Sequence, residues 1–474
     1  MVSPASSLPP PVTQRLAGWL AGVTLADVPL DVRERAKHVL LDGLGCGLMG
    51  AGLPWSRSAT DAICALEPTG PCALIGTGRT TSPSSSALLN SSYIQGFELD
   101  DYHLAAPLHS ASLVLPAMLA ALPNARRSSG ADVLLGAIRG FEVGPRVGLA
   151  LGGAQMLTRG WHSGAVFGGP AAAVAAGTLY DLDAGALEDA LGIAATQACG
   201  LMAAQFGATS KRMQHGFAAR NGLLAAALAA GGYTGIKQVF EREYGGFLST
   251  FGEGHDPDPS QIDAELGERW ETARIAIKPY AAMAGLHAAI DAARELEGAG
   301  TVRPDAIETI EIAVSTPAFH HGGWRAERPL TVVGAQMNLA YAVAVTLLDG
   351  TALAAQFAPD RIDADDVWRL IDRTTVMIDP AFDEVYENGY NTRLRLTTVA
   401  GGSLEAFVDH PRGGIVRPLT NAEIIEKFRT LTAPLIDSAR GHAIEAAVLG
   451  LDELDDAGEL VALLAPPVNS TEAP

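Results

Sequence analysis

The chain has 474 residues, of which 48% are hydrophobic and 18% charged, and it contains 52 glycines. That length exceeds the ~100–200 residues usual for one domain, so two domains are expected, and the composition favours closely packed helices. Its 33 basic and 53 acidic residues give a formal charge of −20. This excess argues against nucleic acid or an anionic membrane as a partner, because both require a basic face. An anionic substrate would need a few cations gathered in one pocket.

The N-terminal part predicts a helical domain over residues 1–270. Between residues 12 and 251, apolar residues recur at spacings of three and four, as in VRERAKHVLLDGLGCGL, and strand-like alternation is sparse. The N-terminus, MVSPASSLPPPV, lacks the basic and apolar regions of a signal peptide. The longest apolar stretch, Ser163 to Tyr180, contains Pro170 and is shorter than the ~20 residues of a membrane span. We therefore expect a cytoplasmic protein.

The four cysteines do not predict a metal site. They lack the paired spacing that zinc or iron–sulfur sites require, and no HxH or HExxH pattern is present. The interpretation is that they are buried thiols in a reducing compartment: Cys46, Cys64, Cys72 and Cys199.

A first polar cluster lies in GFELDDYHLAAPLHSASLVLPA, residues 96–117. Within twelve residues it contains three carboxylates and two histidines: Glu98, Asp100, Asp101, His103 and His109. The apolar run that follows predicts a core helix that Ser110 or Ser112 could cap. His109 would then lie at the helix N-terminus, where the helix dipole favours a carboxylate. The alternative is that these residues are the capping and loop residues of a helix–helix connection.

His162 lies in a second cluster, RGWHSGAVFGGPAAA, after an aromatic residue and before a predicted helix of small residues. A histidine in this position is either a buried hydrogen-bonding residue or a general acid or base that lines a cleft. The GxxxG spacing that follows indicates helix packing. The Walker and GxGxxG patterns of nucleotide binding are absent.

Cations appear in a third cluster, QFGATSKRMQHGFAARNG, inside an otherwise apolar region. Burying Lys211 and Arg212 beside apolar surface is costly unless an anion compensates their charge. Lys211 and His215 are four residues apart and would share one face of a helix. This cluster is a candidate for the cationic pocket. The alternative is a solvated helix edge whose basic side chains extend into water.

After the turn-rich segment GEGHDPDPSQID the pattern changes. ARIAIKPY, IETIEIAVST and TRLRLTTVAGGSLEAFV alternate apolar and polar residues as half-buried strands do, with helices predicted for AGLHAAIDAARELE and NLAYAVAVTLLDG. A smaller α+β domain is therefore predicted over residues 271–408. From Asn421 onward the pattern is helical again, and residues 409–474 could complete the first domain. The fold class is mainly α, with a large all-helical domain and a smaller α+β domain.

Several polar residues of the second domain are also candidates. Lys278 follows a predicted strand and His287 lies in the next helix, and such boundaries often carry ligand-binding groups. Tyr341 lies in AQMNLAYAVAV. The loop FHHGGWRAERP contains three further polar residues, His320, His321 and Arg325. For each of these residues alone, a structural or solvated role is the alternative.

Together, the order and spacing of these clusters resemble the MmgE/PrpD family along nearly the whole chain. The resemblance is carried by ELDDYHLAAPLHSASLVLPA, GWHSGAVFGGPA, LGIAATQACGLMAAQFGA, KRMQHGFAARNGLLAA, YGGFL and GGWRAERP. These stretches look most similar to fungal members that decarboxylate cis-aconitate. The family also includes 2-methylcitrate dehydratases and iminodisuccinate epimerases. The resemblance implies a helical body with an α+β lid, a homodimer, and no metal or organic cofactor.

The resemblance also implies a set of site residues. The family's active-site histidines and lysines correspond to His109, His162, Lys211 and Lys278, its motif acids to Asp100 and Asp101, and its motif tyrosine to Tyr341. The residues expected to bind substrate are His103, Arg212, His215, Lys278 and His287. Tyr102 and Met283 stand where mammalian members carry threonine and histidine, whereas His287 matches a histidine of fungal and bacterial members.

The implied activity is that of a lyase that moves a proton next to a carboxylate of a small di- or tricarboxylate. In the leading hypothesis, His109 or His162 protonates an alkene carbon of cis-aconitate while electrons from the departing carboxylate shift the double bond, giving itaconate. The alternatives are dehydration of 2-methylcitrate or a related hydroxy acid, and inversion of an iminodisuccinate-like substrate. A non-catalytic helical binding protein is the alternative from another class.

Supporting roles are expected from the neighbouring charges. Lys211, Arg212 and Lys278 would bind the retained carboxylates and oppose the developing charge where water is excluded. Asp100 or Asp101 would orient a histidine and hold its tautomer.

Overall fold

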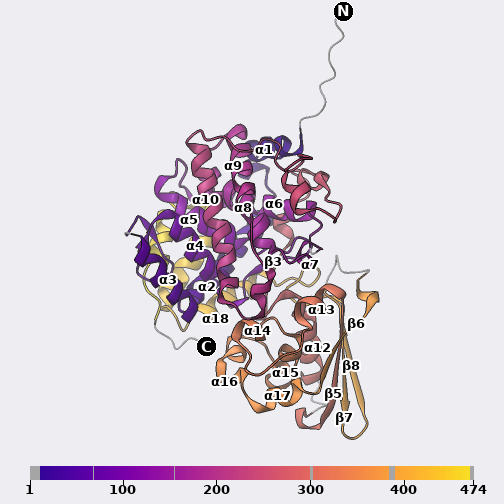
Figure 1. Ribbon diagram of the computed structural model, residues 1–474. Helices are drawn as coiled ribbons and strands as arrows, with labels where there is room; N and C mark the ends of the chain where they lie inside the picture. The colour runs from indigo at the N-terminus through magenta and orange to yellow at the C-terminus, as the bar shows by residue number, and fades with distance from the viewer. Residues whose placement is uncertain (1–10, 68, 154, 299–302, 384–389, 470–474) are drawn as a thin grey trace, which may run out of the picture.

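The computed structural model describes residues 11–67, 69–153, 155–298, 303–383 and 390–469. Figure 1 shows a large helical body beside a smaller lobe, here called the lid, that combines helices with a sheet. The prediction of a mainly α fold with a smaller α+β part is therefore confirmed. The exact domain boundaries at residues 270 and 408 stay a prediction.

The helical body is built from two separate parts of the chain. The N-terminal part supplies α1 (Val12–Gly22), α2 (Leu30–Ala51), α3 (Pro54–Leu66), α4 (Pro83–Ile94), α5 (Ala111–Ala121), α6 (Gly130–Ala150), α7 (Gln155–Thr158), α8 (Ser163–Leu179), α9 (Ala184–Thr196), α10 (Gln214–Ala230) and α11 (Phe247–Phe251). The C-terminal part adds α18 (Asn421–Thr432), α19 (Ser438–Leu449) and α20 (Gly458–Leu464). A short pair of strands, β1 (Cys72–Ala73) and β2 (Thr80–Thr81), lies between α3 and α4.

Helix α8 forms the centre of the body, and all of its residues are buried. Its neighbours α6 and α10 come close because small residues lie where the helices meet. A Cβ added at Gly222 of α10 would be 2.5 Å from Cβ of Ala172, and one added at Gly140 of α6 would be 3.0 Å from the Ala171 carbonyl oxygen. Interiors are close-packed, so larger residues at these glycines would force the helices apart. The predicted small-residue packing is confirmed.

The C-terminal helices return to the body, as predicted. Helix α18 packs against α2, and α19 contacts α2 as well. Gly45 of α2 allows this approach, because an added Cβ would be 3.0 Å from the Phe428 ring of α18.

The lid carries the four-stranded sheet, in the order β6-β5-β7-β8. The strands are β5 (Ile307–Val314), β6 (Thr374–Ile378), β7 (Thr392–Thr398) and β8 (Ser403–Val408), and the helices are α12 (His287–Gly298), α13 (Thr316–Gly322), α14 (Val332–Ala335), α15 (Leu339–Asp349), α16 (Pro359–Ile362) and α17 (Asp365–Ile371). Strand β6 pairs in parallel with β5, and the other pairs are antiparallel. Alternate residues of β7 are buried, consistent with α12 packing on one face of the sheet. Strand β6 was not predicted from the sequence.

One predicted strand pairs elsewhere. ARIAIKPY forms β4 (Ile275–Ile277), which does not join the lid sheet but pairs with β3 (Asp101–His103). The register is antiparallel, with Asp101 opposite Ile277 and His103 opposite Ile275. The expectation that this segment belongs with the other lid strands is wrong, because its hydrogen-bonding partner is the first polar cluster. The pairing places Lys278 beside Glu98 and Asp100.

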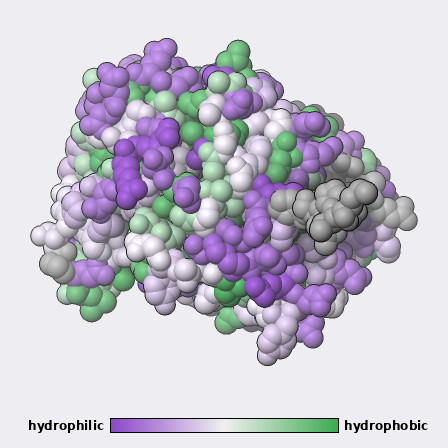
Figure 2. Space-filling model, turned by 90° about the horizontal axis from the view of Figure 1, so that it is seen from above, coloured by the Kyte–Doolittle hydropathy of each residue, from purple (hydrophilic) through white to green (hydrophobic). Residues whose placement is uncertain are grey.

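On the face shown in Figure 2, hydrophilic residues dominate and apolar residues are scattered. Among the described residues, no helix combines the length and the apolar character needed to cross a bilayer. Cys46 and Cys72 are buried as expected, but Cys64 is only half-buried and Cys199 is exposed. The interpretation of all four as buried thiols is therefore wrong for these two.

Candidate active site

The site is organised by the turn that enters β3. Its first residue, Glu98, has a φ of 56°, in the left-handed region that few residues other than glycine adopt. This backbone turn directs the Glu98 carboxylate toward three cations that come from distant parts of the chain. Glu98 is 1% exposed, so its charge is separated from water and depends on these partners.

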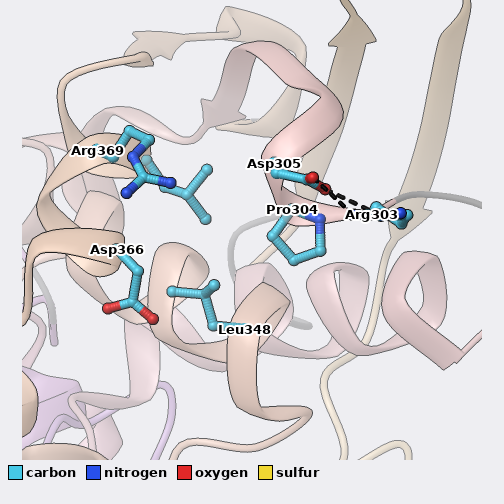
Figure 3. Close-up of a pocket in the computed structure, with 7 residues that line it drawn as sticks. Arg303, Pro304, Asp305, Leu348, Asp366 and Arg369 are labelled. Atoms are coloured by element: carbon cyan, nitrogen blue, oxygen red, sulfur yellow. Dashed lines mark hydrogen bonds and ion pairs between the residues drawn. The ribbon is translucent and has the colours of Figure 1, made fainter.

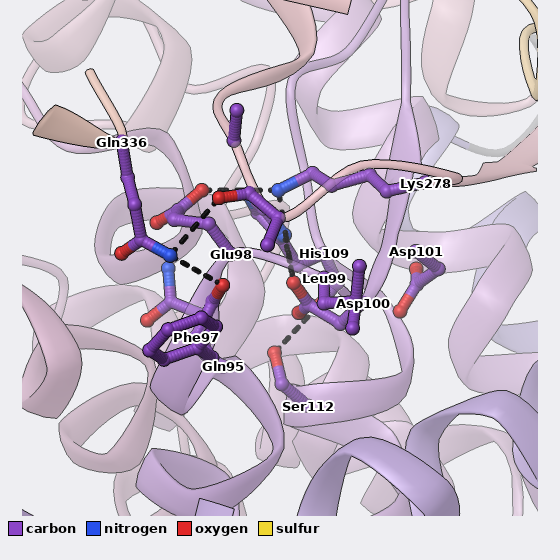
Figure 4. A network of polar contacts seen from close by, with 12 residues as sticks. Gln95, Phe97, Glu98, Leu99, Asp100, Asp101, His109, Ser112, Lys278 and Gln336 are labelled. Atoms are coloured by element: carbon purple, nitrogen blue, oxygen red, sulfur yellow. Dashed lines mark hydrogen bonds and ion pairs between the residues drawn. The ribbon is translucent and has the colours of Figure 1, made fainter. Parts of the chain in front are cut away.

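Figure 4 shows Glu98, Asp100, His109 and Lys278 from close by. The Glu98 carboxylate accepts hydrogen bonds from Lys211, from Arg212 at 2.7 Å and from Lys278 at 3.0 Å. Burial opposes ionisation of Glu98, but Lys211, Lys278 and Arg212 outweigh it and hold the pKa of Glu98 well below its usual value. The buried cations therefore have their compensating anion. The alternative of a solvated helix edge is wrong, because the side chains of Lys211 and Arg212 are nearly inaccessible.

The local structure of the third cluster differs from the prediction. Lys211 lies in a 3₁₀ turn, Thr209–Met213, and α10 begins only at Gln214. Lys211 and His215 therefore belong to two consecutive elements rather than to one helical face. The 3₁₀ turn and the first turn of α10 still bring the two side chains to the same region of the site.

Asp100 orients the first histidine. Nδ1 of His109 donates to Oδ1 of Asp100 at 3.0 Å, which leaves Nε2 of His109 as the free ring nitrogen. Lys278 lies 3.8 Å from the same oxygen. Burial raises the pKa of Asp100, but His109 and Lys278 outweigh this effect and lower it. The carboxylate is thus held ionised beside the imidazole.

Asp101 has a structural position instead. Its carboxylate accepts the backbone N–H groups of Ser110, at 2.6 Å, and Ala111, at 3.0 Å, and so caps α5. The expected capping by Ser110 or Ser112 is wrong, because Ser110 makes no side-chain cap and the Ser112 hydroxyl donates to the His109 carbonyl. Burial and the neighbouring Asp100 raise the pKa of Asp101 well above its usual value.

Three histidine rings pack edge to face. His215 lies between the other two, with ring centroids 5.1 Å from His109 and 5.3 Å from His162. The Ser112 oxygen is 2.7 Å from Nδ1 of His215. Since that hydroxyl already donates to the His109 carbonyl, Nδ1 of His215 is the donor in this bond.

The charged and aromatic groups line a cavity of about 80 Å³ between the body and the lid. Its lining includes predicted residues, namely His103, His109, His162, Lys211 and Lys278, together with Glu98, Tyr102, Pro107, Leu108, Ser163, Met202, Met283, Ala284, His321, Met337 and Tyr390. Four predicted residues from distant parts of the chain therefore converge on this cavity. They are His109, His162 and Lys211, one from each polar cluster, and Lys278, which follows β4.

Burial dominates the electrostatics of this cavity. It lowers the pKa of His162 to about 3, with Lys211 adding to the effect, so His162 is neutral near pH 7. Burial also lowers the pKa of Lys211 to about 8, against the opposing effect of Glu98. His162 has no hydrogen-bond partner for its Nδ1 among the described residues. An anionic ligand in this cavity would stabilise the protonated forms of His162 and Lys211 and so raise both pKa values.

Other predicted residues lie behind the cavity wall. Arg212 binds Glu98 and Gln336, and His215 supports the two flanking imidazoles. His103 reaches the wall, but Glu271 is 3.0 Å from its Nε2 and its Nδ1 accepts the N–H of Ala106.

Two predicted residues do not face the cavity at all. Tyr341 is buried in α15, and its hydroxyl donates to the Gln356 carbonyl. His287 is also buried, with Nε2 3.1 Å from the Ala282 carbonyl oxygen. A catalytic role for Tyr341 and direct substrate binding by His287 are therefore at odds with the structure. Both residues match positions of the family pattern, but their side chains are buried in the lid away from the cavity.

Glu98 and His321 line the cavity, although the sequence analysis assigned neither of them a role in the site. Glu98 was read as part of the first cluster, but the need for a buried anion beside three buried cations could have singled it out. His321 belonged to a glycine-containing loop and lies in α13 of the lid, with Nε2 buried and unpaired among the described residues. Burial, together with His320, lowers the pKa of His321 to about 4. No local pattern distinguished it from His320.

Another hollow on the lid lacks such chemistry. Arg303, Asp305, Asp366 and Arg369 line it together with apolar residues (Figure 3). Arg303 pairs with Asp305 at 2.8 Å, and Asp366 with Arg361 at 2.8 Å. No histidine lines it, so the cavity between body and lid is the candidate active site.

Known proteins resemble this chain over nearly its full length. The profile of the MmgE/PrpD N-terminal domain matches residues 14–260, and that of the MmgE/PrpD C-terminal domain matches residues 280–453. A cis-aconitate decarboxylase-like protein of Aspergillus oryzae is 46% identical, covering 96% of this chain and 97% of its own. Cis-aconitate decarboxylase of Aspergillus terreus is 43% identical over 97% of both chains. The enzyme of that name from Homo sapiens is 25% identical, covering 98% of this chain and 97% of its own.

Proposed function

The chain belongs to the MmgE/PrpD family, and we propose that it is a lyase that decarboxylates cis-aconitate to itaconate. The observation that carries the proposal is the convergence of His109, His162, Lys211 and Lys278 on one cavity. A small acid with several carboxylates fits this chemistry, because imidazoles can transfer protons while ammonium groups bind carboxylates. Two fungal relatives that carry the decarboxylase name, one of them as decarboxylase-like, support this branch of the family.

His109 is the proton donor in this proposal. Its Nδ1 is held by Asp100, so a protonated ring presents the Nε2–H to the substrate. The ionised Asp100 carboxylate holds the orientation of the ring. His162, which burial keeps neutral near pH 7, is assigned to hydrogen bonding with a substrate carboxylate. Of the two candidate histidines, His109 and His162, the proposal therefore assigns proton donation to His109.

The reaction consumes one proton for each carbon dioxide released. His109 transfers its proton to the alkene carbon that bears hydrogen. The carboxylate on the methylene carbon leaves as carbon dioxide, and the electron pair of the broken bond forms the new double bond of itaconate. His109 regains a proton from solvent before the next turnover. No atom other than that proton has to be supplied.

Lys211 and Lys278 bind the two carboxylates that are retained. Each ammonium has three N–H donors and uses one of them for Glu98, so further donors remain for a substrate. In a site that excludes water, such charges stabilise a developing negative charge strongly. Glu98 sets the positions of the two lysines through these hydrogen bonds, and Arg212 supports them by binding the same carboxylate.

The decisive experiment is incubation of the purified protein with cis-aconitate, 2-methylcitrate and iminodisuccinate in separate reactions, followed by NMR of the products. We expect itaconate and carbon dioxide from cis-aconitate, and no product from a His109→Asn control. Dehydration of 2-methylcitrate or inversion of iminodisuccinate, without decarboxylation, would replace the proposal by one of the alternatives. A folded protein that converts none of the three would favour a binding role.

We also propose that the protein works as a homodimer in the cytoplasm, as the family resemblance implies. Light scattering on the purified chain tests the first part, since a mass twice that of the 49.1 kDa monomer is expected. Fractionation of the native host cell tests the second.

A further inference from the structure

A buried ion pair lies behind the active-site turn. Lys427 of α18 and Asp42 of α2 are 2.6 Å apart, and the side chains are 11% and 0% exposed. The Lys427 ammonium also donates to the carbonyl of Leu99. Leu99 stands between Glu98 and Asp100, the two carboxylates that hold the lysines and His109. The last part of the chain therefore contacts the backbone of the catalytic turn directly.

Packing alone does not explain this ion pair. Two helices can be joined by apolar side chains at least as well as by a buried charge pair, because removing two ions from water is costly. Helices α2 and α18 already have such a contact, where the Phe428 ring lies against Gly45. The ion pair adds one thing that an apolar pair could not supply, a donor for the Leu99 carbonyl.

The turn itself requires support. Glu98 has a left-handed backbone, which persists at a non-glycine residue when its surroundings hold it in place. The Leu99 carbonyl follows directly after this residue. That carbonyl belongs to the peptide between Leu99 and Asp100, so fixing it limits ψ of Leu99 and φ of Asp100. It thereby limits the directions in which the flanking Glu98 and Asp100 carboxylates can point.

We infer that Lys427, held by Asp42, is a positioning residue for the reaction. It fixes the Leu99 carbonyl and thereby the carboxylates of Glu98 and Asp100. Glu98 in turn places Lys211 and Lys278, and Asp100 places His109. Lys427 is not among the residues that line the active-site cavity. The kinetic part of this inference rests on the proposed function.

A second cavity gives experimental access to Lys427. This cavity of about 600 Å³ is lined mostly by apolar residues, and its charged lining residues are Arg412, Glu423, Glu426 and Lys427. Its wall includes Leu99 and Pro279, which are the sequence neighbours of Asp100 and Lys278. It reaches the surface at Leu353, which is 41% exposed. Shortening Lys427 would therefore open a path by which a small amine can reach the Leu99 carbonyl.

The first experiment is a rescue of Lys427→Ala in the full-length protein. A misplacement of ~1 Å in an active site can lower the rate by ~100-fold, so we expect kcat to fall by about that factor with a smaller change in KM. Propylammonium at millimolar concentration is expected to restore much of kcat, whereas propanol, which has the same length without the charge, is not. Arg429→Ala is the matched control, because Arg429 lies on the same helix in an exposed ion pair with Glu445. It is expected to keep wild-type kinetics.

A second variant separates positioning from stability. In the double variant Asp42→Leu/Lys427→Met both charges are removed, so the thermal midpoint is expected to recover relative to Lys427→Ala. Activity is not expected to recover, because the Leu99 carbonyl still lacks its donor. Wild-type kcat in this double variant would overturn the inference, as would rescue of Lys427→Ala by propanol as efficiently as by propylammonium.

A readout that does not need turnover distinguishes this inference from the proposed function. The imidazole ¹⁵N shifts of His109 report its hydrogen bond to Asp100. We expect them to change in Lys427→Ala and to return when propylammonium is added, whichever substrate the enzyme uses. Unchanged shifts would refute the positioning role even if cis-aconitate is the substrate. Changed shifts without decarboxylation by the wild type would refute only the proposed function.

Discussion

The His215 ring lies directly over Gly164, the second residue of α8. A Cβ added at Gly164 would be 1.9 Å from Nε2 of His215, far inside the contact distance of the two atoms. This glycine therefore allows the ring to lie between His109 and His162. A small residue at the start of the core helix thus determines the spacing of the histidine cluster.

Gly164→Ala is expected to displace His215 and the two rings that pack on it. Overpacking of this kind costs ~1–3 kcal/mol of the free energy of unfolding, and we expect kcat to fall by ~100-fold because the proton donor moves. Urea unfolding and steady-state kinetics measure the two effects. Gly18→Ala in α1 is the control, since an added Cβ there meets nothing within 4 Å. An alanine at position 164 that leaves kcat unchanged would contradict the importance of this contact.

Asp100→Asn should lower activity much more than stability. The asparagine keeps the size of the side chain but removes the carboxylate charge that accepts the hydrogen bond from Nδ1 of His109. General acid catalysis typically contributes ~10²–10⁴-fold, and we expect a loss of kcat within that range. Stopped-assay NMR of itaconate formation measures kcat, and circular dichroism checks the fold. A variant with near wild-type kcat would transfer the role of proton donor to another residue.

Glu98→Gln is expected to destabilise the protein. The carboxylate compensates three buried cations, and breaking a buried pair typically costs ~3–5 kcal/mol because an uncompensated charge remains. The shift in the urea midpoint at pH 7 gives the size of the effect. Glu445→Gln breaks the exposed pair with Arg429 and should change the unfolding free energy by ~1 kcal/mol or less. Equal effects of the two substitutions would contradict the network described for Glu98.

The pH dependence of kcat/KM is expected to show an alkaline limb near pH 8. Burial lowers the pKa of Lys211 to about 8, so in the free enzyme the ammonium is present below that pH and is lost above it. The substrate carboxylates stay ionised throughout this range, so the loss of positive charge weakens their binding. Lys211→Arg should move the limb to higher pH, because arginine keeps its proton. A limb at the same pH in both proteins would assign it to another group.

His321→Phe is expected to raise KM without loss of stability. The buried Nε2 of His321 has no partner among the described residues, so replacing the ring by an apolar one leaves no new polar group unsatisfied. KM for cis-aconitate should increase by ~10-fold if one hydrogen bond to a carboxylate is lost, since a hydrogen bond to a charged group contributes ~1.5–3 kcal/mol. His320→Phe is the matched control, because that side chain is exposed. An unchanged KM for His321→Phe would remove this histidine from the binding site.

Several features of the site followed from local sequence. Helix α2 was predicted from the spacing of its apolar residues, and Lys278 was placed correctly after a strand. Local patterns work in these cases because a helix or a strand repeats its buried positions along the chain. The family resemblance added which polar residues to examine, although it also included Tyr341 and His287, which the structure uses in packing.

The contacts that build the cavity could not be read from local patterns. Glu98 is 113 residues from Lys211 and 180 from Lys278, and Lys427 is 328 residues from Leu99. Likewise, β4 pairs with β3 and Asp101 caps α5. A periodic pattern shows that a side chain is buried but not which distant group will satisfy it.

The sequence by itself determined that this protein is mainly helical, that it is acidic, and that it carries histidines and lysines in a few polar clusters. Only the tertiary structure decided which of them meet. The reason is physical: a buried charge requires a partner, and the choice of partner depends on how the whole chain packs. For this chain, that packing makes Glu98 the centre of the lysine cluster and turns Asp101 into a helix cap.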